Sequence, residues 1–453
     1  MTYQFKVLPQ KVKKISTKYR CIQTKIPCPG TSKVLNSLKN NESRSMHGQI
    51  PLVWESAKNF TITDKSGNKW IDFTSGIFFA NIGHGNPYLV KSLKNSLSRP
   101  LLGSYSYGNE VRERYFRELI SFAGTNFEKA FLLSSGTEST EAALKLMRMN
   151  GRKISNKKIG IISLQNNWHG RTMGSQLMSG NEGQKEWIGY KDKTIHHLPF
   201  PYPWHLKNIS GKEFALKIIN ELIKSGVNPK KEICGFILET FQGWGAIFYP
   251  EDFVVEIKKF CKENNILLTF DEMQSGFART GKAFGYEHYN VEADLLCIGK
   301  GMGGGYPISG VIGKECVMDL PEVGNMSSTH SANPLGCSAG LAVLREIKRK
   351  NLIKETERKG FILNKFLSSL KKENPEKISY TFGKGLISSI IFHKNNMPDI
   401  NLASKVSELC MQKGLLVVHT GRESIKIGPP LTITDQALIE GLSVLEETIK
   451  ELY

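Results

Sequence analysis

Three polar side chains stand at the last or next-to-last position of three short apolar runs. The runs ICGFILET, NILLTFDE and ADLLCIGK carry Glu239, Asp271 and Lys300 in these positions, about thirty residues apart. That separation is typical of repeated strand–helix–strand units. In an open α/β sheet, ligands bind outside the carboxyl ends of the strands, so we expect the three side chains to share one crevice. Two carboxylates and a lysine in a crevice form a candidate catalytic group.

A second chemical signal precedes these runs, in the sequence FLLSSGTESTEAALKLMRMNG at 131–151. FLLS predicts a strand, and Ser135 and Glu138 have the spacing of a capping box at the start of a helix. Gly136 and Thr137 then lie in the first helical turn, where free N–H groups and the positive end of the helix dipole suit a phosphate. Many capped helices bind nothing, so this signal depends on the lysine and the carboxylates.

A lysine beside a phosphate site and a buried carboxylate predicts a Schiff base to pyridoxal phosphate. Asp271 would keep the pyridine nitrogen of that cofactor protonated, so that the ring accepts electrons. The run GMGGGYP after Lys300 matches neither G-x-G-x-x-G nor a Walker P-loop. We interpret it as a tight connection between strands that passes close to a ligand bound at Lys300.

The apolar runs predict the strands and helices that hold these residues in place. The segments 233–240, 265–272, 293–300 and 308–314 read as buried strands, because they are short and almost continuously apolar. Between the first two, Pro250 opens an amphipathic helical pattern. The alternation of strand and helix predicts an α/β fold with a mostly parallel central sheet.

Several motifs, in order, resemble the class III pyridoxal-phosphate aminotransferases. They are SSGTESTEAALKLMR, NNWHGRT, ILETFQGWGA, LLTFDEMQSGFARTG, CIGKGMGGGYPISGVIG and SSTHSANPLGCSAGLAVL. The chain looks most similar to 4-aminobutyrate aminotransferases, from about Trp54 to its C-terminus. The resemblance implies the PLP-dependent transferase fold type I. It places a large cofactor-binding domain at 76–335 and a smaller α+β domain built from 1–75 and 336–453.

The resemblance also implies roles for the residues in the cofactor site. Lys300 would form the internal aldimine and later carry the proton between Cα and C4′. Asp271 would pair with the pyridine nitrogen, and Gln274 would hydrogen-bond the ring hydroxyl. Gly136 and Thr137 match the residues whose backbone holds the phosphate.

Two further cofactor residues follow from the same motifs. Thr329 matches a threonine that reaches the phosphate from the neighbouring subunit, which implies a homodimer with shared active sites. Trp168 replaces the Phe or Tyr that usually stacks on the cofactor ring, and an indole can stack at least as well. The alternative for Trp168 is a core aromatic next to His169.

The substrate side departs from the family pattern. Glu239 and Gln242 match the E-x-x-Q-G motif, whose glutamate pairs with a mobile arginine. The segment usually written R-x-x-P-P-L reads KIGPPL here, so the arginine position is Lys426. Lysine keeps the charge and loses the planar fork that fits a carboxylate, so we expect weaker carboxylate affinity. Arg422 is a possible substitute, and an exposed loop arginine is the alternative.

The segment SGIFFANIGHGNP resembles the family loop at the substrate entrance and places Ile77 and Phe79 near the outer end of the pocket. Phe78 and Phe79 stand where smaller residues are common. This pattern indicates an apolar or altered outer pocket, with plain core packing as the alternative.

The function implied is transfer of an amino group from an amine or ω-amino acid, similar to 4-aminobutyrate, to a 2-oxo acid by a ping-pong route through Lys300. An isomerase, either an amino-acid racemase or an aminomutase, shares every cofactor motif and is the alternative. A non-catalytic cofactor-binding protein is a third interpretation, which Lys300, Asp271 and Gln274 disfavour.

Composition excludes several other classes. The 61 Lys and Arg against 42 Asp and Glu give a net charge of +19. The lysines are scattered without aromatic interleaving, so we expect a solvated surface and no nucleic-acid partner. No apolar run is long enough for a membrane span, and the N-terminus has no secretory pattern, so we expect a cytoplasmic enzyme. The eight cysteines show no zinc-ligand spacing and read as reduced core thiols, with no metal site.

Overall fold

The computed structural model describes residues 3–46, 48–99 and 101–452. Within them the chain folds into two compact units. The larger unit consists of Tyr88–Gly243 and Ile247–Ile353. The smaller unit consists of the described residues up to Pro87, of Trp244–Ala246 and of the described residues from Lys354 onward.

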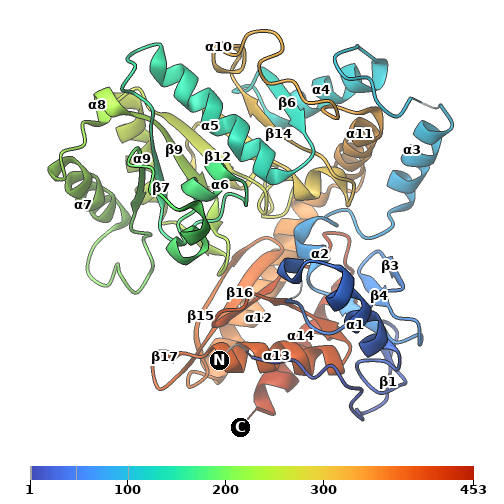
Figure 1. Ribbon diagram of the computed structural model, residues 1–453. Coiled ribbons are helices and arrows are strands. Elements are labelled where there is room, and N and C mark those ends of the chain that lie inside the picture. Colours follow the sequence, from blue (N-terminus) through green and yellow to red (C-terminus); the bar gives the residue numbers. More distant parts are fainter. Residues whose placement is uncertain (1–2, 47, 100, 453) are drawn as a thin grey trace. The chain divides into compact units, whose positions relative to one another are not determined.

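The larger unit is built on a sheet that has seven strands among the described residues (Figure 1). In spatial order they are β6 (Lys129–Leu133), β14 (Ser309–Gly313), β13 (Leu295–Ile298), β12 (Leu267–Asp271), β9 (Ile233–Glu239), β7 (Gly160–Leu164) and β8 (Ile195–Leu198). The pairs from β13 to β8 are parallel, which confirms the predicted parallel centre. Strand β14 runs antiparallel to both neighbours, because the chain returns from β13 without a crossover helix.

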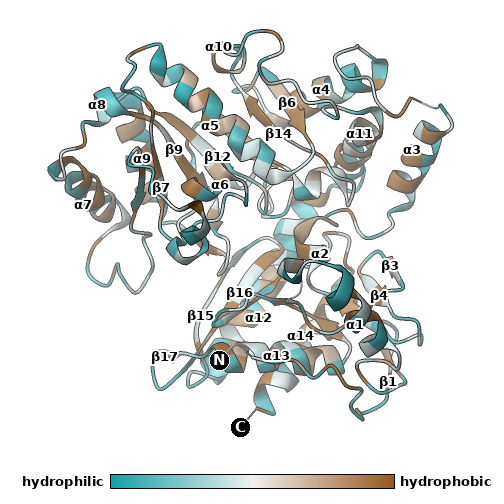
Figure 2. Ribbon diagram, in the orientation of Figure 1, coloured by the Kyte–Doolittle hydropathy of each residue, from teal (hydrophilic) through white to brown (hydrophobic). Residues whose placement is uncertain are grey.

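Helices cover this sheet on both faces. Helix α5 (Gly136–Arg152) packs on the face that carries Ile237, Leu295 and Val311, all fully buried. Side chains alternate along a strand, so Phe270 of β12 points to the other face, where its ring contacts those of Tyr286 and Tyr289. Figure 2 shows the hydrophobic residues gathered in β9 and β12 and hydrophilic ones along the outer side of α5. The parallel strands are apolar because both faces are covered.

Local signals start and stop the helices as predicted. The capping box at α5 is present, and the Glu138 carboxylate accepts hydrogen bonds from the Ser135 N–H at 2.7 Å and the Ser134 N–H at 3.1 Å. Helix α9 (Glu251–Glu263) follows Pro250 and ends at Asn264. Carboxylate acceptors for the first N–H groups are what an α-helix start requires.

The remaining elements of the larger unit are shorter or peripheral. They are α3 (Pro87–Leu97), α4 (Glu110–Ala123), α6 (Met173–Met178), η2 (Glu182–Gln184), η3 (Glu186–Ile188), α7 (Gly211–Lys224), α8 (Pro229–Glu232), β10 (Phe241–Gln242), β11 (Ile247–Phe248), η4 (Gly285–Tyr289), η5 (Lys300–Gly303), α10 (Glu315–Met318) and α11 (Pro334–Arg349). The glycine-rich run after Lys300 is the strand connection that the sequence indicated, and η5 begins it.

The smaller unit contains two sheets among the described residues. The first is β1 (Ile15–Ser16), β2 (Cys21–Ile22), β5 (Lys69–Asp72), β4 (Thr61–Thr63) and β3 (Ser56–Lys58), with β18 (Leu415–Leu416) parallel to β5. The second is β15 (Ile378–Lys384), β16 (Ile387–Lys394), β20 (Ser424–Ile427) and β19 (Val418–His419), with β17 (Met397–Pro398) on β16. The helices are α1 (Thr31–Asn41), η1 (Arg44–Met46), α2 (Ser75–Phe78), α13 (Ile400–Gln412) and α14 (Asp435–Lys450), and α12 (Leu352–Glu373) enters from the larger unit.

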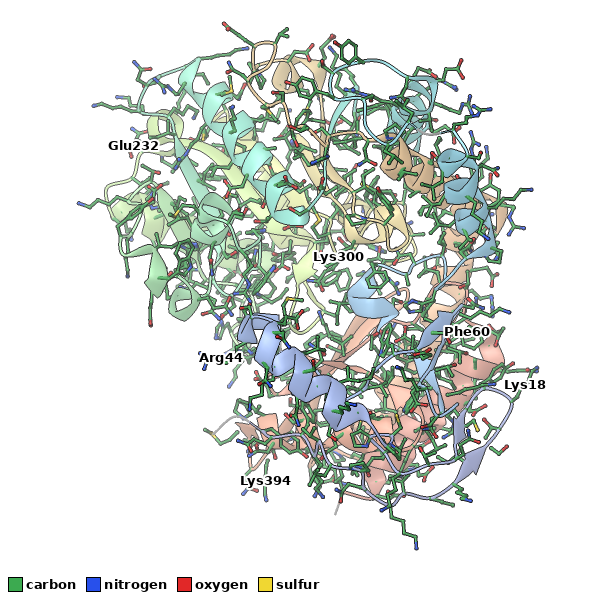
Figure 3. The ribbon with its side chains drawn as sticks, turned by 45° about the vertical axis from the view of Figure 1, so that its right-hand side comes forward. Lys18, Arg44, Phe60, Glu232, Lys300 and Lys394 are labelled. Carbon is green, nitrogen blue, oxygen red and sulfur yellow. The ribbon has the colours of Figure 1, made fainter. Side chains whose placement is uncertain are left out.

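The N-terminal segment, which lies outside the family resemblance, packs on its own unit. The Arg20 guanidinium pairs with Glu440 at 2.7 Å, and the Tyr3 hydroxyl donates to Glu408 at 2.6 Å. The exposed Lys18 and Lys394 point outward at the periphery of the smaller unit (Figure 3). Surface lysines of this kind account for part of the net positive charge.

The observed boundaries differ from the expected large domain at 76–335. The segment after residue 75 stays with the smaller unit, because the Leu431 N–H donates to the Asn81 carbonyl at 2.9 Å. Helix α11 stays with the larger unit, because it packs on α4 and Arg345 pairs with Glu118 at 2.5 Å. The larger unit therefore begins at Tyr88 and ends at Ile353.

In the part of the chain that the structure describes, no helix is both long and apolar enough to cross a membrane. The eight cysteines are free thiols. Six of them are buried, as expected for core thiols, while Cys316 is exposed and Cys21 is half-buried. Cys316 was expected in the core and lies instead at the start of the short surface helix α10.

Gly151, in the last turn of α5, provides a test of the packing of this helix on β9. A Cβ atom at this position would collide with the Lys158 carbonyl oxygen and with Cys234. We expect Gly151→Ala to lower the free energy of unfolding by about 1–3 kcal/mol, because buried backbone atoms cannot move aside. Urea unfolding measures the change. Gly108→Ala is the control, since a Cβ there meets nothing within 4 Å, and equal stability of the two variants would contradict this packing.

Candidate active site

A cavity of about 310 Å³ lies in the larger unit at the carboxyl ends of β9, β12 and β13. This volume is at the lower end of the range for small-molecule sites. Seven of the residues singled out from the sequence line it: Gly136, Thr137, Trp168, Glu239, Asp271, Gln274 and Lys300. Two ionisable residues, His169 and Arg171, also line the cavity. Neither of them was assigned a role from the sequence.

Strand register brings the three chemical groups together. Asp271 pairs with Glu239 on β9 and with Cys297 on β13, all in parallel register. Strand β13 ends one residue later, and Lys300 follows immediately after Gly299. Parallel strands in register end at the same edge, so residues about thirty positions apart in sequence become neighbours.

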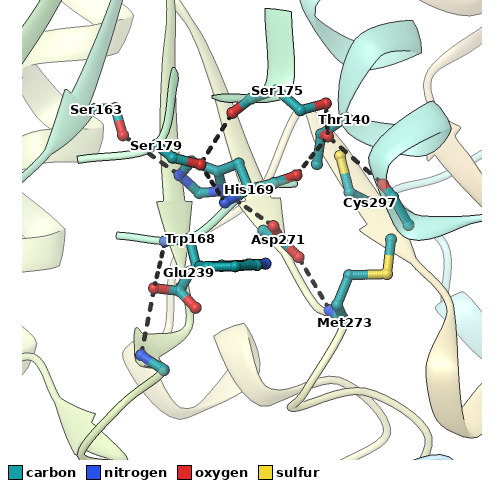
Figure 4. Close-up of polar contacts among 12 residues, drawn as sticks. Thr140, Ser163, Trp168, His169, Ser175, Ser179, Glu239, Asp271, Met273 and Cys297 are labelled. Atoms are coloured by element: carbon teal, nitrogen blue, oxygen red, sulfur yellow. Dashed lines mark hydrogen bonds and ion pairs between the residues drawn. The ribbon is translucent and has the colours of Figure 1, made fainter. Parts of the chain in front are cut away.

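Asp271 is held by two hydrogen-bond donors (Figure 4). Its Oδ2 lies 2.9 Å from His169 Nδ1, and its Oδ1 accepts from the Met273 N–H at 3.1 Å. The His169 ring is itself fixed, since Nε2 lies 3.3 Å from Ser163 Oγ and the backbone N–H donates to Ser179 Oγ at 2.8 Å. With Nδ1 donating to the carboxylate, Nε2 accepts from the serine hydroxyl. The position of His169 next to Trp168 was the only sequence signal for this role.

Lys300 occupies an unusual backbone conformation. Its φ is +43°, in the left-handed region that non-glycine residues seldom adopt, and Gly304 and Gly305 follow with φ of +60° and +111°. Strained residues of this kind gather at functional sites. Burial lowers the pKa of the Lys300 ammonium below its ordinary value, while Asp271 and then Glu239 partly oppose the shift. A lysine with a lowered pKa supplies more neutral amine near pH 7, as a base or nucleophile requires.

The Thr137 side chain holds a neighbouring loop in place. Its Oγ1 accepts hydrogen bonds from the Arg171 N–H at 3.2 Å and the Thr172 N–H at 3.1 Å. Gly170 has a φ of +143° and lies so close that a Cβ would collide with the threonine side chain. The hydroxyl therefore holds the 170–172 loop, and the N–H groups of Gly136 and Thr137 at the helix start are the groups that suit a phosphate.

Glu239 and Arg171 add opposite charges to the cavity. Glu239 Oε2 accepts from the Trp168 N–H at 3.2 Å and from the Gly243 N–H at 3.3 Å (Figure 4). The Arg171 guanidinium lies 4.1 Å from the centroid of the Trp168 ring, within cation–π range. Burial lowers the pKa of Arg171, but an arginine remains charged in proteins. The R of the W-H-G-R-T run was the available sequence signal for this cation.

Four of the expected site residues lie outside this cavity. Ile77, Phe79 and Lys426 belong to the smaller unit, where Ile77 is 39% exposed and Lys426 is buried in β20. Thr329 is an exposed loop residue before α11 and does not line the cavity of its own chain. Their substrate and cofactor roles remain predictions.

The carboxylates beside Lys300 predict a pH effect that can be measured without cofactor. Asp271→Asn or Glu239→Gln removes a group that raises the pKa of Lys300, so the pKa should fall further in both variants, and more in Asp271→Asn. Acetylation of the Lys300 peptide, followed by mass spectrometry across pH, should then begin at lower pH than in the unaltered chain. Glu263→Gln, at an exposed carboxylate of the same unit, should leave the profile unchanged. A shift to higher pH in either variant would contradict this electrostatic assignment.

These groups fit pyridoxal phosphate. Lys300 is an amine of lowered pKa, Asp271 is a buried carboxylate fixed by two donors, and the start of α5 offers N–H groups to a phosphate. Trp168 presents a flat ring, and Gln274 an amide, to the same cavity. An aldehyde, a basic ring nitrogen and a phosphate each find a complementary group.

Comparison with known proteins agrees with this chemistry. The family described as "Aminotransferase class-III" matches residues 43–449. Acetylornithine aminotransferase of Caldanaerobacter subterraneus subsp. tengcongensis is 31% identical over 410 residues, covering 90% of this chain and 96% of that protein. The mitochondrial acetylornithine aminotransferase of Candida glabrata is 33% identical over 407 residues, covering 87% and 90%.

Solved structures share the architecture. Acetylornithine aminotransferase from Elizabethkingia anophelis has a TM-score of 0.78 at 25% identity, covering 93% of this chain and 99% of that chain. A transaminase from the marine bacterium Virgibacillus has a TM-score of 0.83 at 24% identity, covering 92% and 98%, and shows the fold. These neighbours give the chain the PLP-dependent transferase fold type I. It belongs to the class III aminotransferases and is a pyridoxal-phosphate-dependent enzyme.

Proposed function

We propose that this enzyme transfers the terminal amino group of an ω-amino acid to a 2-oxo acid by a ping-pong route. The named relatives are acetylornithine aminotransferases, and a further one, from Emericella nidulans, is an ornithine aminotransferase. The sequence motifs favoured 4-aminobutyrate as the donor. These relatives instead support a donor of the ornithine type. Nothing among these relatives supports the racemase or aminomutase alternative.

One observation carries the proposal: Lys300, Asp271 and Arg171 line a single cavity. Pyridoxal phosphate, when bound, supplies a ring that accepts electrons from the carbon next to the substrate nitrogen. Lys300 Nζ would take the proton from that carbon and return it at the other end of the transfer. Asp271, fixed by His169, would hold a positive charge on the ring nitrogen.

The charged groups around Trp168 suit an amino acid substrate. Arg171 offers a two-pronged donor to a carboxylate, and it is held in the cavity by the indole ring. Glu239 adds a carboxylate to the same cavity, where it accepts from the Trp168 N–H. A donor that carries a carboxylate far from its reacting amine fits this pair of charges better than a simple amine.

We further propose a homodimer in which Thr329 serves the partner's cofactor. Thr329 is exposed and lies outside the cavity of its own chain, as that role requires. Exposed apolar side chains in the larger unit, including Leu102 (60% exposed) and Tyr107 (78% exposed), also support a covered surface.

Lys300→Ala tests the catalytic assignment. We expect activity with N-acetylornithine or ornithine and 2-oxoglutarate to fall by at least about 1,000-fold, because the base and cofactor anchor are both lost. Product formation measured with a coupled glutamate assay reports the loss. Lys212→Ala, at an exposed lysine of the same unit, is the control and should retain full activity. Full activity of Lys300→Ala would overturn the assignment.

A donor panel without acceptor separates transfer from isomerisation. With ornithine, N-acetylornithine and 4-aminobutyrate as donors, a transaminase releases one equivalent of oxo product per active site and then stops. Mass spectrometry of the product measures this stoichiometry. A racemase would instead remove the optical activity of ornithine or N-acetylornithine with no oxo acid present, and that outcome would contradict the proposal.

Thr137→Val tests how the cofactor site is held. The valine keeps the shape of the side chain and loses the hydroxyl that accepts from Arg171 and Thr172. The Thr137 hydroxyl also shares a hydrogen bond of 2.7 Å with the Thr172 hydroxyl. Loss of three hydrogen bonds at about 0.5–1.5 kcal/mol each should raise the dissociation constant of pyridoxal phosphate at least about 10-fold. Absorbance titration of cofactor-free enzyme measures it. Thr137→Ser retains the hydroxyl and should bind close to normally, so weak binding by both variants would contradict this role.

A further inference from the structure

Glu272 is a second buried carboxylate at the end of β12, next to Asp271. Its side chain is fully buried. Asp271 lines the cavity of the candidate active site, and Glu272 does not. Successive side chains of a strand point to opposite sides. The Glu272 carboxylate therefore lies behind the cavity wall.

Four hydrogen-bond donors converge on the Glu272 carboxylate. Its Oε1 accepts from the Thr240 hydroxyl at 2.6 Å and from the Tyr286 N–H at 2.7 Å. Its Oε2 accepts from the Ser275 hydroxyl at 2.6 Å and from the Gly285 N–H at 2.8 Å. Burial raises the pKa of the Glu272 carboxyl, and these four hydrogen bonds oppose the rise. Two donors on each oxygen fix the group in one position.

The donors come from three segments of the larger unit. Thr240 follows Glu239 at the end of β9, and Ser275 follows Gln274 after the end of β12. The two backbone N–H donors belong to the first residues of η4. Both hydroxyl donors line the cavity. One buried side chain thus holds two parts of the cavity wall against the start of η4.

Gly285 is packed between the two hydroxyl donors. A Cβ atom at this position would lie 2.7 Å from Thr240 Cγ2 and 2.8 Å from Ser275 Cβ. Heavy atoms do not come this close, so a side chain at 285 would push the two residues apart. The Tyr289 hydroxyl, at the other end of η4, donates to the Thr240 carbonyl at 2.5 Å. Packing and hydrogen bonds therefore set the same separation.

The loop between Ser275 and Gly285 is strained. Phe277 and Ala278 have φ values of +56° and +70°, in the left-handed region that non-glycine residues seldom adopt. The buried Phe277 ring stacks on Phe122 of α4 at a centroid distance of 5.9 Å. Strained residues persist only where surrounding contacts fix them, and they gather at functional sites. The Glu272 carboxylate closes this loop by accepting from both of its ends.

We propose that Glu272 is a positioning residue for the cofactor cavity. It acts through Ser275 and Thr240, and thereby fixes Gln274 and Glu239, the cavity-lining residues next to them. A complete polar network holds a site rigid, while loss of one member leaves buried donors without an acceptor. The proposal rests on one earlier assignment, that this cavity binds pyridoxal phosphate with Gln274 in its wall.

A double-mutant cycle on cofactor affinity tests this role. Glu272→Gln keeps the shape of the side chain, but its –NH₂ group replaces one acceptor oxygen, so one buried N–H loses its partner. We expect the dissociation constant of pyridoxal phosphate, from absorbance titration of cofactor-free enzyme, to rise at least about fivefold. Gln274→Ala should raise it too. The double variant should bind at least about threefold more tightly than the product of the two effects predicts, because a displaced Gln274 has less affinity to lose.

The absorbance of the bound cofactor gives a second readout. The pH midpoint of its visible absorbance change should move in Glu272→Gln in the same direction as in Gln274→Ala, because both substitutions alter the polar surroundings of the ring. Glu287→Gln is the matched control. Glu287 is a half-buried carboxylate of the same helix η4 and accepts from the Phe284 N–H at 2.8 Å. Its substitution should change neither the dissociation constant nor the midpoint.

Gly285→Ala tests the same contacts with the carboxylate intact. Its Cβ atom would separate Thr240 from Ser275, so the dissociation constant should rise at least about threefold and the absorbance midpoint should move. Thermal unfolding verifies that each variant folds. If Glu272→Gln does not fold, Gly285→Ala takes its place in the cycle with Gln274→Ala.

Four results would overturn the proposal. The first is a folded Glu272→Gln enzyme with unchanged affinity and absorbance. The second is a pair of effects that simply multiply in the double variant, as general destabilisation would produce. The third is an equal effect of Glu287→Gln, and the fourth is a Gln274→Ala enzyme that binds the cofactor normally. Because cofactor binding needs no turnover, this proposal can fail while amino-group transfer succeeds, and it can succeed while the donor panel fails.

Discussion

Asp271 is a carboxylate that is 5% exposed at the end of a strand buried on both faces. A charge in such a place requires hydrogen-bond donors that are themselves held still. The His169 ring and the Met273 N–H supply them, and Ser163 and Ser179 fix the histidine in turn. The loop that carries His169 also carries Trp168, so the position of the indole ring follows from how the carboxylate is held.

The same loop contributes both an aromatic ring and a cation to the cavity. Its residues 170–172 are held by the Thr137 hydroxyl, at the start of the helix that suits a phosphate. Arg171 leaves this loop to lie over the Trp168 ring. One threonine thereby links the helix start, the aromatic ring and the cation.

The smaller unit also contains a buried carboxylate that holds a loop in place and an aromatic ring next to a cation. There the carboxylate of Asp72 holds a strained turn at residues 75–78, whose Phe78 ring lies beneath the buried Lys426. A cation can be buried when an aromatic face replaces part of its hydration. In the larger unit the exposed Arg171 lies over the Trp168 ring. In both units a cation lies within cation–π range of an aromatic ring.

The sequence by itself determined the features that depend on neighbouring residues. Strand ends at Glu239 and Asp271, the capping box at Ser135 and the parallel centre of the sheet follow from apolar runs and helix-start signals, which are local. Family motifs supplied the expected roles of Lys300 and Gln274, and they indicated the aminotransferase family itself.

Tertiary structure decided the contacts between residues far apart in sequence. His169 and Asp271 are 102 positions apart, and Phe78 and Lys426 about 350 apart, so no local pattern relates them. The observed domain boundaries differ from the expected ones for the same reason. Helix α11 belongs to the larger unit because its side chains pack there. Side-chain packing depends on the whole fold, and periodicity along the chain reports only which face of an element is buried.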